Sequence, residues 1–128
     1  MTTETQLLRK FLHGEIDNGE FHHIDHLRLG FAIVRRHPFP EAAAAFCAAL
    51  KLIAAQAGKP AAYHETISIA FLSVIAERNA AGDHPDFESF ARDNDDLLEK
   101  SALERWYTRD RLHSDIARTT FLLPGPIQ

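Results

Sequence analysis

The chain has 128 residues, of which 45% are hydrophobic and 25% are charged, the composition of an ordinary globular protein. This length predicts a single domain over 1–128, large enough to bury one core without disulfides or structural metals. The net charge of −4 argues against nucleic acid as a partner, because phosphate binding requires a dense basic surface.

Three features of the sequence indicate where the protein resides. The N-terminal residues lack the basic and apolar regions of a signal peptide. Cys47 is the single cysteine, so no internal disulfide can form, which suits a reducing compartment. The longest apolar stretch, Ala42–Leu50, is too short to span a bilayer. We therefore expect a cytoplasmic protein with no membrane partner.

Residues that typically start and end helices recur along the chain, whereas the sustained alternation of apolar and polar residues that is typical of strands is missing. Thr2 or Thr3 is expected to cap the first helix, and Gly14 to close it. Prolines break the chain after the second helix and open the third and the fourth. These signals predict four helices, over about 3–13, 21–36, 40–57 and 60–79, with a polar connection at 16–20.

The last third of the chain predicts shorter helices. Pro85 opens one, Asn94 can cap another, and the Ser-Ala-Leu-Glu sequence at 101–104 has the form of a capping box. Thr108 is expected to cap a last helix, which is followed by an extended tail over 119–128. Together these elements predict an all-α fold, a compact bundle of five to seven helices.

The expected third helix is unusual in its composition. It contains nine alanines and only three polar residues, Glu41, Lys51 and Gln56. A helix with so little polarity is expected to be covered on more than one side. It is therefore either central to the bundle or the interface of a homodimer.

Eight histidines are present, and two of them share one side of the second helix. On a helical wheel, His22 and His26 lie beside Leu29 and Ile33, away from the charged residues. Their i, i+4 spacing places both rings on one face. Because a hydrated side chain on an apolar face is costly without a partner, these histidines indicate a polar pocket.

The start of the fourth helix carries a second set of polar residues. His64 and Ser68 fall on the apolar side of the wheel with Tyr63, and Glu65 also projects into apolar surroundings. If the second and fourth helices pack together, both sets face one internal pocket. The whole site hypothesis depends on that contact.

A metal centre is one interpretation of this pocket. His22, His26 and His64 would supply three imidazole ligands and Glu65 a carboxylate. Such a set suits a first-row transition metal such as Fe, Mn, Ni or Zn, and does not choose among them. The spacing alone is a weak signal, because the HExxH motif and the paired ExxH motifs of di-iron bundles are missing from the sequence.

An organic ligand is the other interpretation. His64 and Glu65 would then form a catalytic pair, with the imidazole as general base, since its ordinary pKa lies near neutrality. Tyr63, Ser68 and Asp25 would contact the bound molecule. The leading hypothesis is therefore an enzyme or a binding protein for a small molecule, with or without a metal.

Two further hypotheses remain open at this stage. The histidines can be structural and donate to backbone carbonyls, in which case the protein is a non-enzymatic interaction module, a homodimer through the alanine-rich helix. Alternatively, buried histidines can make the bundle a pH-responsive switch.

Overall fold

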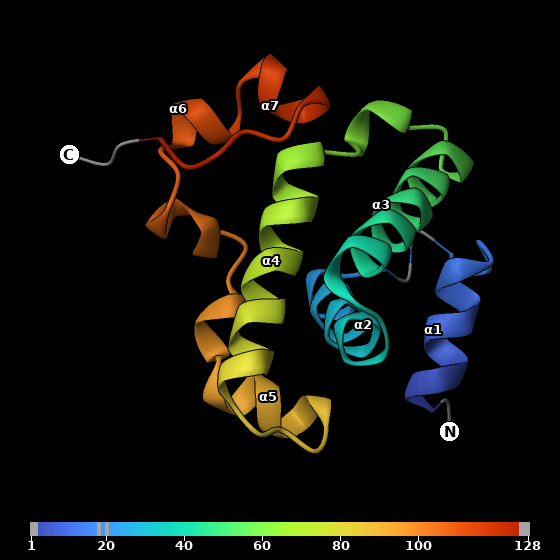
Figure 1. Ribbon diagram of the computed structural model, residues 1–128. Coiled ribbons are helices and arrows are strands. Elements are labelled where there is room, and N and C mark those ends of the chain that lie inside the picture. Colours follow the sequence, from blue (N-terminus) through green and yellow to red (C-terminus); the bar gives the residue numbers. More distant parts are fainter. Residues whose placement is uncertain (1–2, 18, 20, 126–128) are drawn as a thin grey trace.

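The structure is a computed structural model and describes residues 3–17, 19 and 21–125 (Figure 1). Seven α-helices and three short 3₁₀ helices make up this part of the chain, and it contains no strand, which confirms the all-α prediction. The α-helices are α1 (Glu4–Leu12), α2 (His23–Arg36), α3 (Phe39–Gln56), α4 (Glu65–Ala81), α5 (Phe87–Asp93), α6 (Arg109–Leu112) and α7 (Asp115–Thr119). The 3₁₀ helices are η2 (Pro60–Ala62), η3 (Asp95–Leu98) and η4 (Ala102–Arg105).

Helix α1 begins as the sequence predicts. The Thr3 side chain accepts a hydrogen bond from the Gln6 N–H at 3.1 Å, and the Gln6 side chain accepts one from the Thr3 N–H at 2.9 Å. This reciprocal pair satisfies two amides that the helix itself leaves free. Gly14 follows the helix with a φ of +70°, a conformation that favours glycine. The alternative cap, Thr2, lies outside the described residues, as does part of the connection at 16–20.

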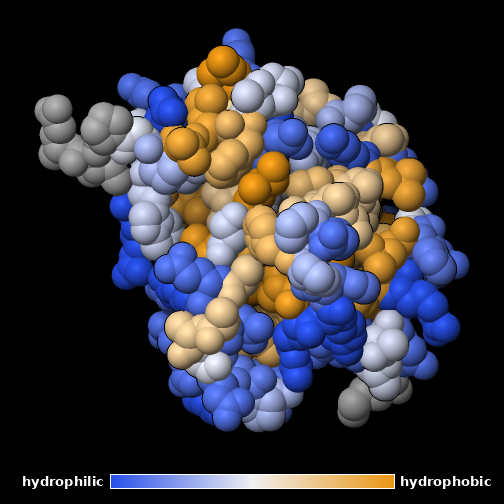
Figure 2. Space-filling view, in the orientation of Figure 1, coloured by the Kyte–Doolittle hydropathy of each residue, from blue (hydrophilic) through white to orange (hydrophobic). Residues whose placement is uncertain are grey.

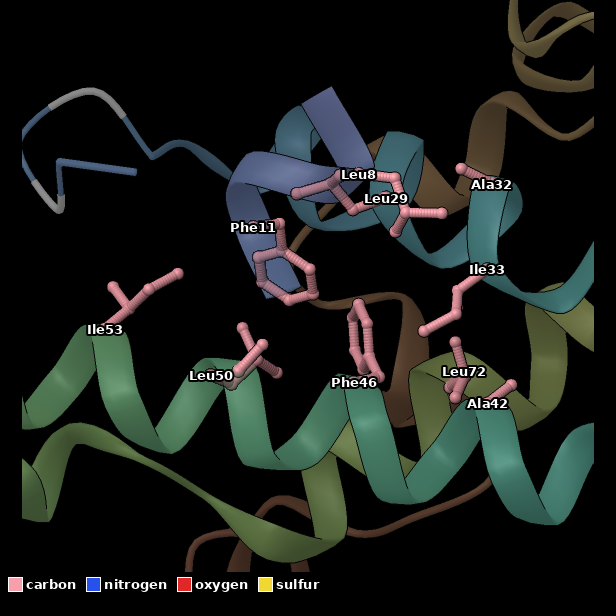
Figure 3. Close-up of a cluster of buried hydrophobic side chains, with 11 residues drawn as sticks. Leu8, Phe11, Leu29, Ala32, Ile33, Ala42, Phe46, Leu50, Ile53 and Leu72 are labelled. Carbon is pink, nitrogen blue, oxygen red and sulfur yellow. The ribbon is translucent and has the colours of Figure 1, made fainter. Parts of the chain in front are cut away.

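Helices α1, α2 and α3 share the largest apolar cluster (Figure 3). Phe11 from α1 and Phe46 from α3 lie at its centre, with their ring centroids 5.5 Å apart. The other labelled side chains converge on these two rings, and one of them, Leu72, comes from α4. Burying such side chains contributes about 1.5–3 kcal/mol each, so this cluster fixes the position of α3 against the rest of the bundle.

Helix α4 is the centre of the molecule, and its contact with α2 is the most extensive between any two helices. Figure 1 shows α2 viewed down its axis, whereas α4 lies in the plane of the picture, so the two helices cross steeply. They meet at Gly30, where an added Cβ would lie 2.8 Å from the Ile75 Cδ1 atom. The contact on which the site hypothesis depends is therefore present.

The chain after α4 covers the remaining sides of that helix. Phe87 and Phe90 from α5 pack with Phe31 of α2 in a second apolar cluster. A third cluster places Tyr107 and Leu112 against the outer side of α4. All three apolar clusters thus include residues of α4. This helix is covered on several sides, which explains why few of its residues are polar.

The segment that follows α7 returns across α4. The Thr66 hydroxyl donates to the Thr120 carbonyl at 2.8 Å and accepts from the Leu122 N–H at 3.1 Å. The Tyr107 hydroxyl donates to the Leu122 carbonyl at 2.7 Å. The expected tail is thus non-helical from Thr120 but is hydrogen-bonded to the bundle as far as Leu123, whose carbonyl accepts from the Arg111 Nε–H at 2.8 Å, and residues 126–128 lie outside the described part.

Replacing Thr66 with valine is expected to lower the free energy of unfolding by about 2 kcal/mol. Thr66 is fully buried, and the apolar isostere leaves the Thr120 carbonyl and the Leu122 N–H, in two part-buried hydrogen bonds, without their partner. Equilibrium unfolding in urea measures the change. Thr66→Ser, which keeps the hydroxyl and loses only a methyl group, is the control and should cost about 1 kcal/mol. A valine variant as stable as the serine variant would contradict this account.

Two helix starts differ from the sequence prediction, and both carry histidines. Helix α2 begins at His23, so His22 is an extended N-cap residue. The chain after Pro60 closes a single 3₁₀ turn and then runs extended through Tyr63 and His64, so α4 begins only at Glu65. Helical wheels therefore misplace His22 and His64, because neither has helical backbone angles.

Smaller differences occur in the last third. The Ser101 side chain makes no cap hydrogen bond, so the expected capping box at 101–104 is wrong. The single helix expected after Thr108 is two short helices, because Ser114 starts a new one by accepting from the Ala117 N–H at 3.3 Å. Serine at this position competes with helix continuation through its own backbone hydrogen bonds.

Helix α3 is a core helix on one side, whereas the expected cover on more than one side is not found among the described residues. It buries Phe46, Leu50 and Ile53 among other residues, whereas Ala44 and Ala48 stay exposed. Within the described residues, α3 is long and apolar enough to cross a membrane by length and composition, criteria that core helices of soluble proteins also meet.

Candidate functional site: a pocket between α2, α3 and α4

A pocket of about 830 Å³ opens between the start of α2, the second half of α3 and the first turns of α4. Its wall is mainly apolar and includes Phe21, Leu27, Phe46, Leu50, Ile67 and Phe71. Its polar residues are five histidines, two lysines, Tyr63 and Ser68. This volume and this mixture of apolar wall and few polar groups are typical of sites for small organic molecules.

The sequence placed histidines from two helices around one pocket, and the structure brings them there. His22, His26 and His64 all line it, together with Tyr63 and Ser68. Asp25 and Glu65 do not line the pocket, although each is next in sequence to a histidine that does. Figure 2 shows apolar residues gathered over the region of α3 and α4, with hydrophilic residues around them.

His64 has both ring nitrogens engaged. Its Nδ1 accepts from the Ile67 N–H at 3.1 Å and caps α4, and its Nε2–H donates to the Leu112 carbonyl at 2.8 Å. The side chain is buried, and burial lowers the pKa of His64, in keeping with a neutral ring that both accepts and donates. No lone pair or proton of this ring is left for a substrate or a metal in this arrangement.

The residues beside His64 are also bonded within the protein. The Tyr63 hydroxyl donates to the Glu65 carboxylate at 2.7 Å. The Ser68 hydroxyl donates to the His64 carbonyl at 2.7 Å. Burial is the main reason that the pKa of Tyr63 is raised, so its hydroxyl stays protonated and remains a donor to Glu65. The hydroxyls of Tyr63 and Ser68 therefore have a structural role in the pocket wall, because each donates its proton to another group of the protein.

Asp25 has a capping role at the start of α2. Its carboxylate accepts from the His22 N–H at 3.0 Å, which satisfies one of the free amides of this helix end. A negative charge is also favourable at a helix N-terminus. The expected ligand contact from Asp25 is therefore replaced by a structural one.

His26 is the histidine best placed to meet a ligand. Its ring packs on Phe21 with centroids 4.3 Å apart, and no hydrogen-bond partner for it is found among the described residues. His23 differs, since its Nε2–H donates to the Leu97 carbonyl at 3.0 Å. Burial, with smaller contributions from the charges of His23 and Lys100, lowers the pKa of His26 to about 4, so the ring is neutral at pH 7.

The side-chain arrangement gives no support to the expected metal site. In the part of the chain that the structure describes, no three His, Cys, Asp or Glu side chains are grouped so that they could hold a metal ion. The reason lies in the helix starts: His22 precedes α2 and does not stack on His26, and the nitrogens of His64 are bonded to backbone. Glu65 accepts from Tyr63 instead of facing the histidines.

Two lysines of the pocket were not expected from the sequence, and a third polar residue, His113, was expected only as a weaker contributor. Lys59 follows the end of α3, Lys100 lies between η3 and η4, and His113 ends α6 with its ring centroid 6.4 Å from that of His64. Lysines in turns have no periodicity that a wheel can detect. The sequence places His113 on the uncharged side of the expected last helix, which the structure divides into two.

No protein-family model matches the chain, and neither a curated protein nor a solved structure matches it significantly. The function is therefore argued from the pocket itself.

Proposed function

We propose that the pocket between α2, α3 and α4 binds a small organic molecule. The observation that carries the proposal is the pocket of about 830 Å³, which a well-packed helical bundle of this size does not need for stability. Its wall is apolar, and its few polar groups come from separate elements and converge on one space. Such a combination favours a ligand with a large apolar surface and one polar end.

Binding is favoured over catalysis because the expected catalytic groups are occupied. A general base needs a free lone pair within reach of the substrate, and both nitrogens of His64 are bonded to backbone groups. His26 has an accessible ring, but a pKa of about 4 makes it a weak base at pH 7. The Glu65 carboxylate accepts from Tyr63 and does not orient His64.

The remaining expectations stay predictions. Exposed alanines on α3, such as Ala44 and Ala48, are compatible with the homodimer but do not identify what covers them. The cytoplasmic location and the lack of nucleic-acid and membrane partners still rest on composition. The pocket supports the proposal that a small organic molecule is the partner.

The neutral fluorophore N-phenyl-1-naphthylamine is a direct probe of this proposal. Its fluorescence is expected to rise on binding to the folded protein, with one site per chain and a micromolar dissociation constant. Ala57→Phe, which fills the pocket from the end of α3, should weaken binding by at least about tenfold. Fluorescence titration measures both values.

Ala55→Phe is the matched control, because Ala55 is exposed on the same helix and does not line the pocket. This variant should bind the probe within about twofold of the parent protein. Circular dichroism establishes that both variants are folded. Equal binding by the parent, Ala57→Phe and Ala55→Phe, or no binding at all by the folded parent, would overturn the proposal.

A further inference from the structure

The charges around the pocket are distributed unevenly. The chain has 18 acidic and 14 basic residues, yet none of the described residues that line the pocket is acidic. Two lysines and five histidines do line it. The two carboxylates nearest in sequence, Asp25 and Glu65, are hydrogen-bonded to the protein itself, at His22 and Tyr63. The polar part of the pocket therefore presents cationic and N–H groups to a ligand.

The two lysines are available for a ligand. Lys59 and Lys100 are exposed, and neither forms an ion pair with a carboxylate of the described residues within 4.0 Å. Lys100 and His26 both line the pocket, and the charge of Lys100 helps to lower the pKa of His26, whereas the charge of Asp25 raises it. One ammonium and one neutral imidazole thus belong to the lining of the same pocket.

Most of the remaining wall is apolar. Phe46, Leu50 and Ile53 from α3 and Ile67 and Phe71 from α4 provide it. An apolar body gains about 25 cal/mol for each Å² that it buries there. A ligand with a charged head at Lys100 and an apolar body against these residues uses both parts of the pocket.

Resting on the proposed binding function, we infer that the ligand is an apolar carboxylate, with its head group at Lys100 and His26 and its hydrocarbon body against α3. One ammonium with a neutral imidazole suits a singly charged head. Arginine, which commonly holds doubly charged phosphate esters, does not occur among the described residues of the pocket. Medium-chain fatty acids and hydrophobic aromatic acids belong to this class.

Competition between decanoate and decanol for the fluorophore site tests the inference. The two molecules share a ten-carbon body and differ in the head group, and each is titrated at pH 7.5 against bound N-phenyl-1-naphthylamine. Decanoate is expected to bind about tenfold more tightly than decanol, although it is the more strongly hydrated of the two. Equal affinities, or tighter binding of decanol, would overturn the inference while leaving the pocket as a binding site.

Lysine variants locate the head group. Lys100→Gln is expected to weaken decanoate about tenfold and decanol less than twofold, whereas Lys100→Arg, which keeps the charge, retains most of the affinity for decanoate. Lys10→Gln, on α1 and outside the pocket, is the control and should change neither. A loss of the same size for both ligands in Lys100→Gln would contradict a head group at this lysine.

An independent readout uses the His26 ring. A carboxylate bound beside it raises the pKa of His26, so its ring resonances, followed by NMR, should titrate at higher pH with decanoate than with decanol. An unchanged titration with decanoate bound would overturn the placement at His26. If the fluorophore itself fails to bind the folded protein, the proposed function fails, and this outcome is distinct from the two that concern the head group.

Discussion

His64→Ala is expected to lower the free energy of unfolding by about 3 kcal/mol. The loss of the cap at the Ile67 N–H costs about 1 kcal/mol. The Leu112 carbonyl, which accepts from the ring at 2.8 Å in a buried position, then lacks its donor at a further cost of about 1–3 kcal/mol. Urea denaturation followed by circular dichroism measures the change.

His64→Asn separates the two contributions. Asparagine is a good N-cap residue, so this variant keeps the start of α4, but its shorter side chain does not reach the Leu112 carbonyl. We expect it to recover about 1 kcal/mol of the loss. A loss below about 1 kcal/mol for the alanine variant would show that the ring is not structural and would return His64 to the list of ligand-binding candidates.

The second large effect is a loss of stability in mild acid. The pKa of His26 is about 4 in the folded protein and near 6.5 in the unfolded chain, because burial opposes the charged ring. Between these values the unfolded state binds a proton that the folded state does not. Stability is therefore complete above about pH 6.5 and declines as the pH falls towards 4, by roughly 3 kcal/mol from this residue.

The difference between the parent protein and His26→Phe isolates this residue from other titrating groups. Phenylalanine keeps the contact with the Phe21 ring but does not titrate. The unfolding free energies of both proteins, measured by denaturant at several pH values from 4 to 7.5, should diverge as the pH falls, because only the parent loses roughly 3 kcal/mol from this residue. Parallel curves would contradict a depressed pKa at His26.

Helix count, fold class and the approximate position of α3 could be predicted from the sequence, because periodicity and proline positions report them directly. The boundaries of α3 differ from the prediction by one residue at each end, within the usual uncertainty of helix ends. The start of α4 was not predictable in this way. Pro60 opens a helix in either case, and whether it continues past Ala62 depends on the distant Leu112 carbonyl that holds the His64 ring.

The site was predictable in its residues more than in its chemistry. The sequence suggested that His22, His26 and His64 face one pocket, and all three line the pocket found where α2 and α4 pack together. A wheel assumes helical angles, however, and His22 and His64 are extended cap residues, so their side-chain directions could not be inferred. Lys59 and Lys100 come from turns, whose approach to the pocket is decided by tertiary packing alone.

The hydrogen bonds between Thr66 and the segment after α7 cannot form until that segment has been synthesised. Thr66 and Thr120 are 54 residues apart in the sequence. At roughly 5–20 residues per second, the ribosome takes about 3 to 11 seconds to make this stretch. For most of that interval Tyr107, Leu112 and Leu122 have not yet been made, so nothing from them covers the outer side of α4. The nascent chain therefore presents an apolar helix face to the cell before the protein can close over it.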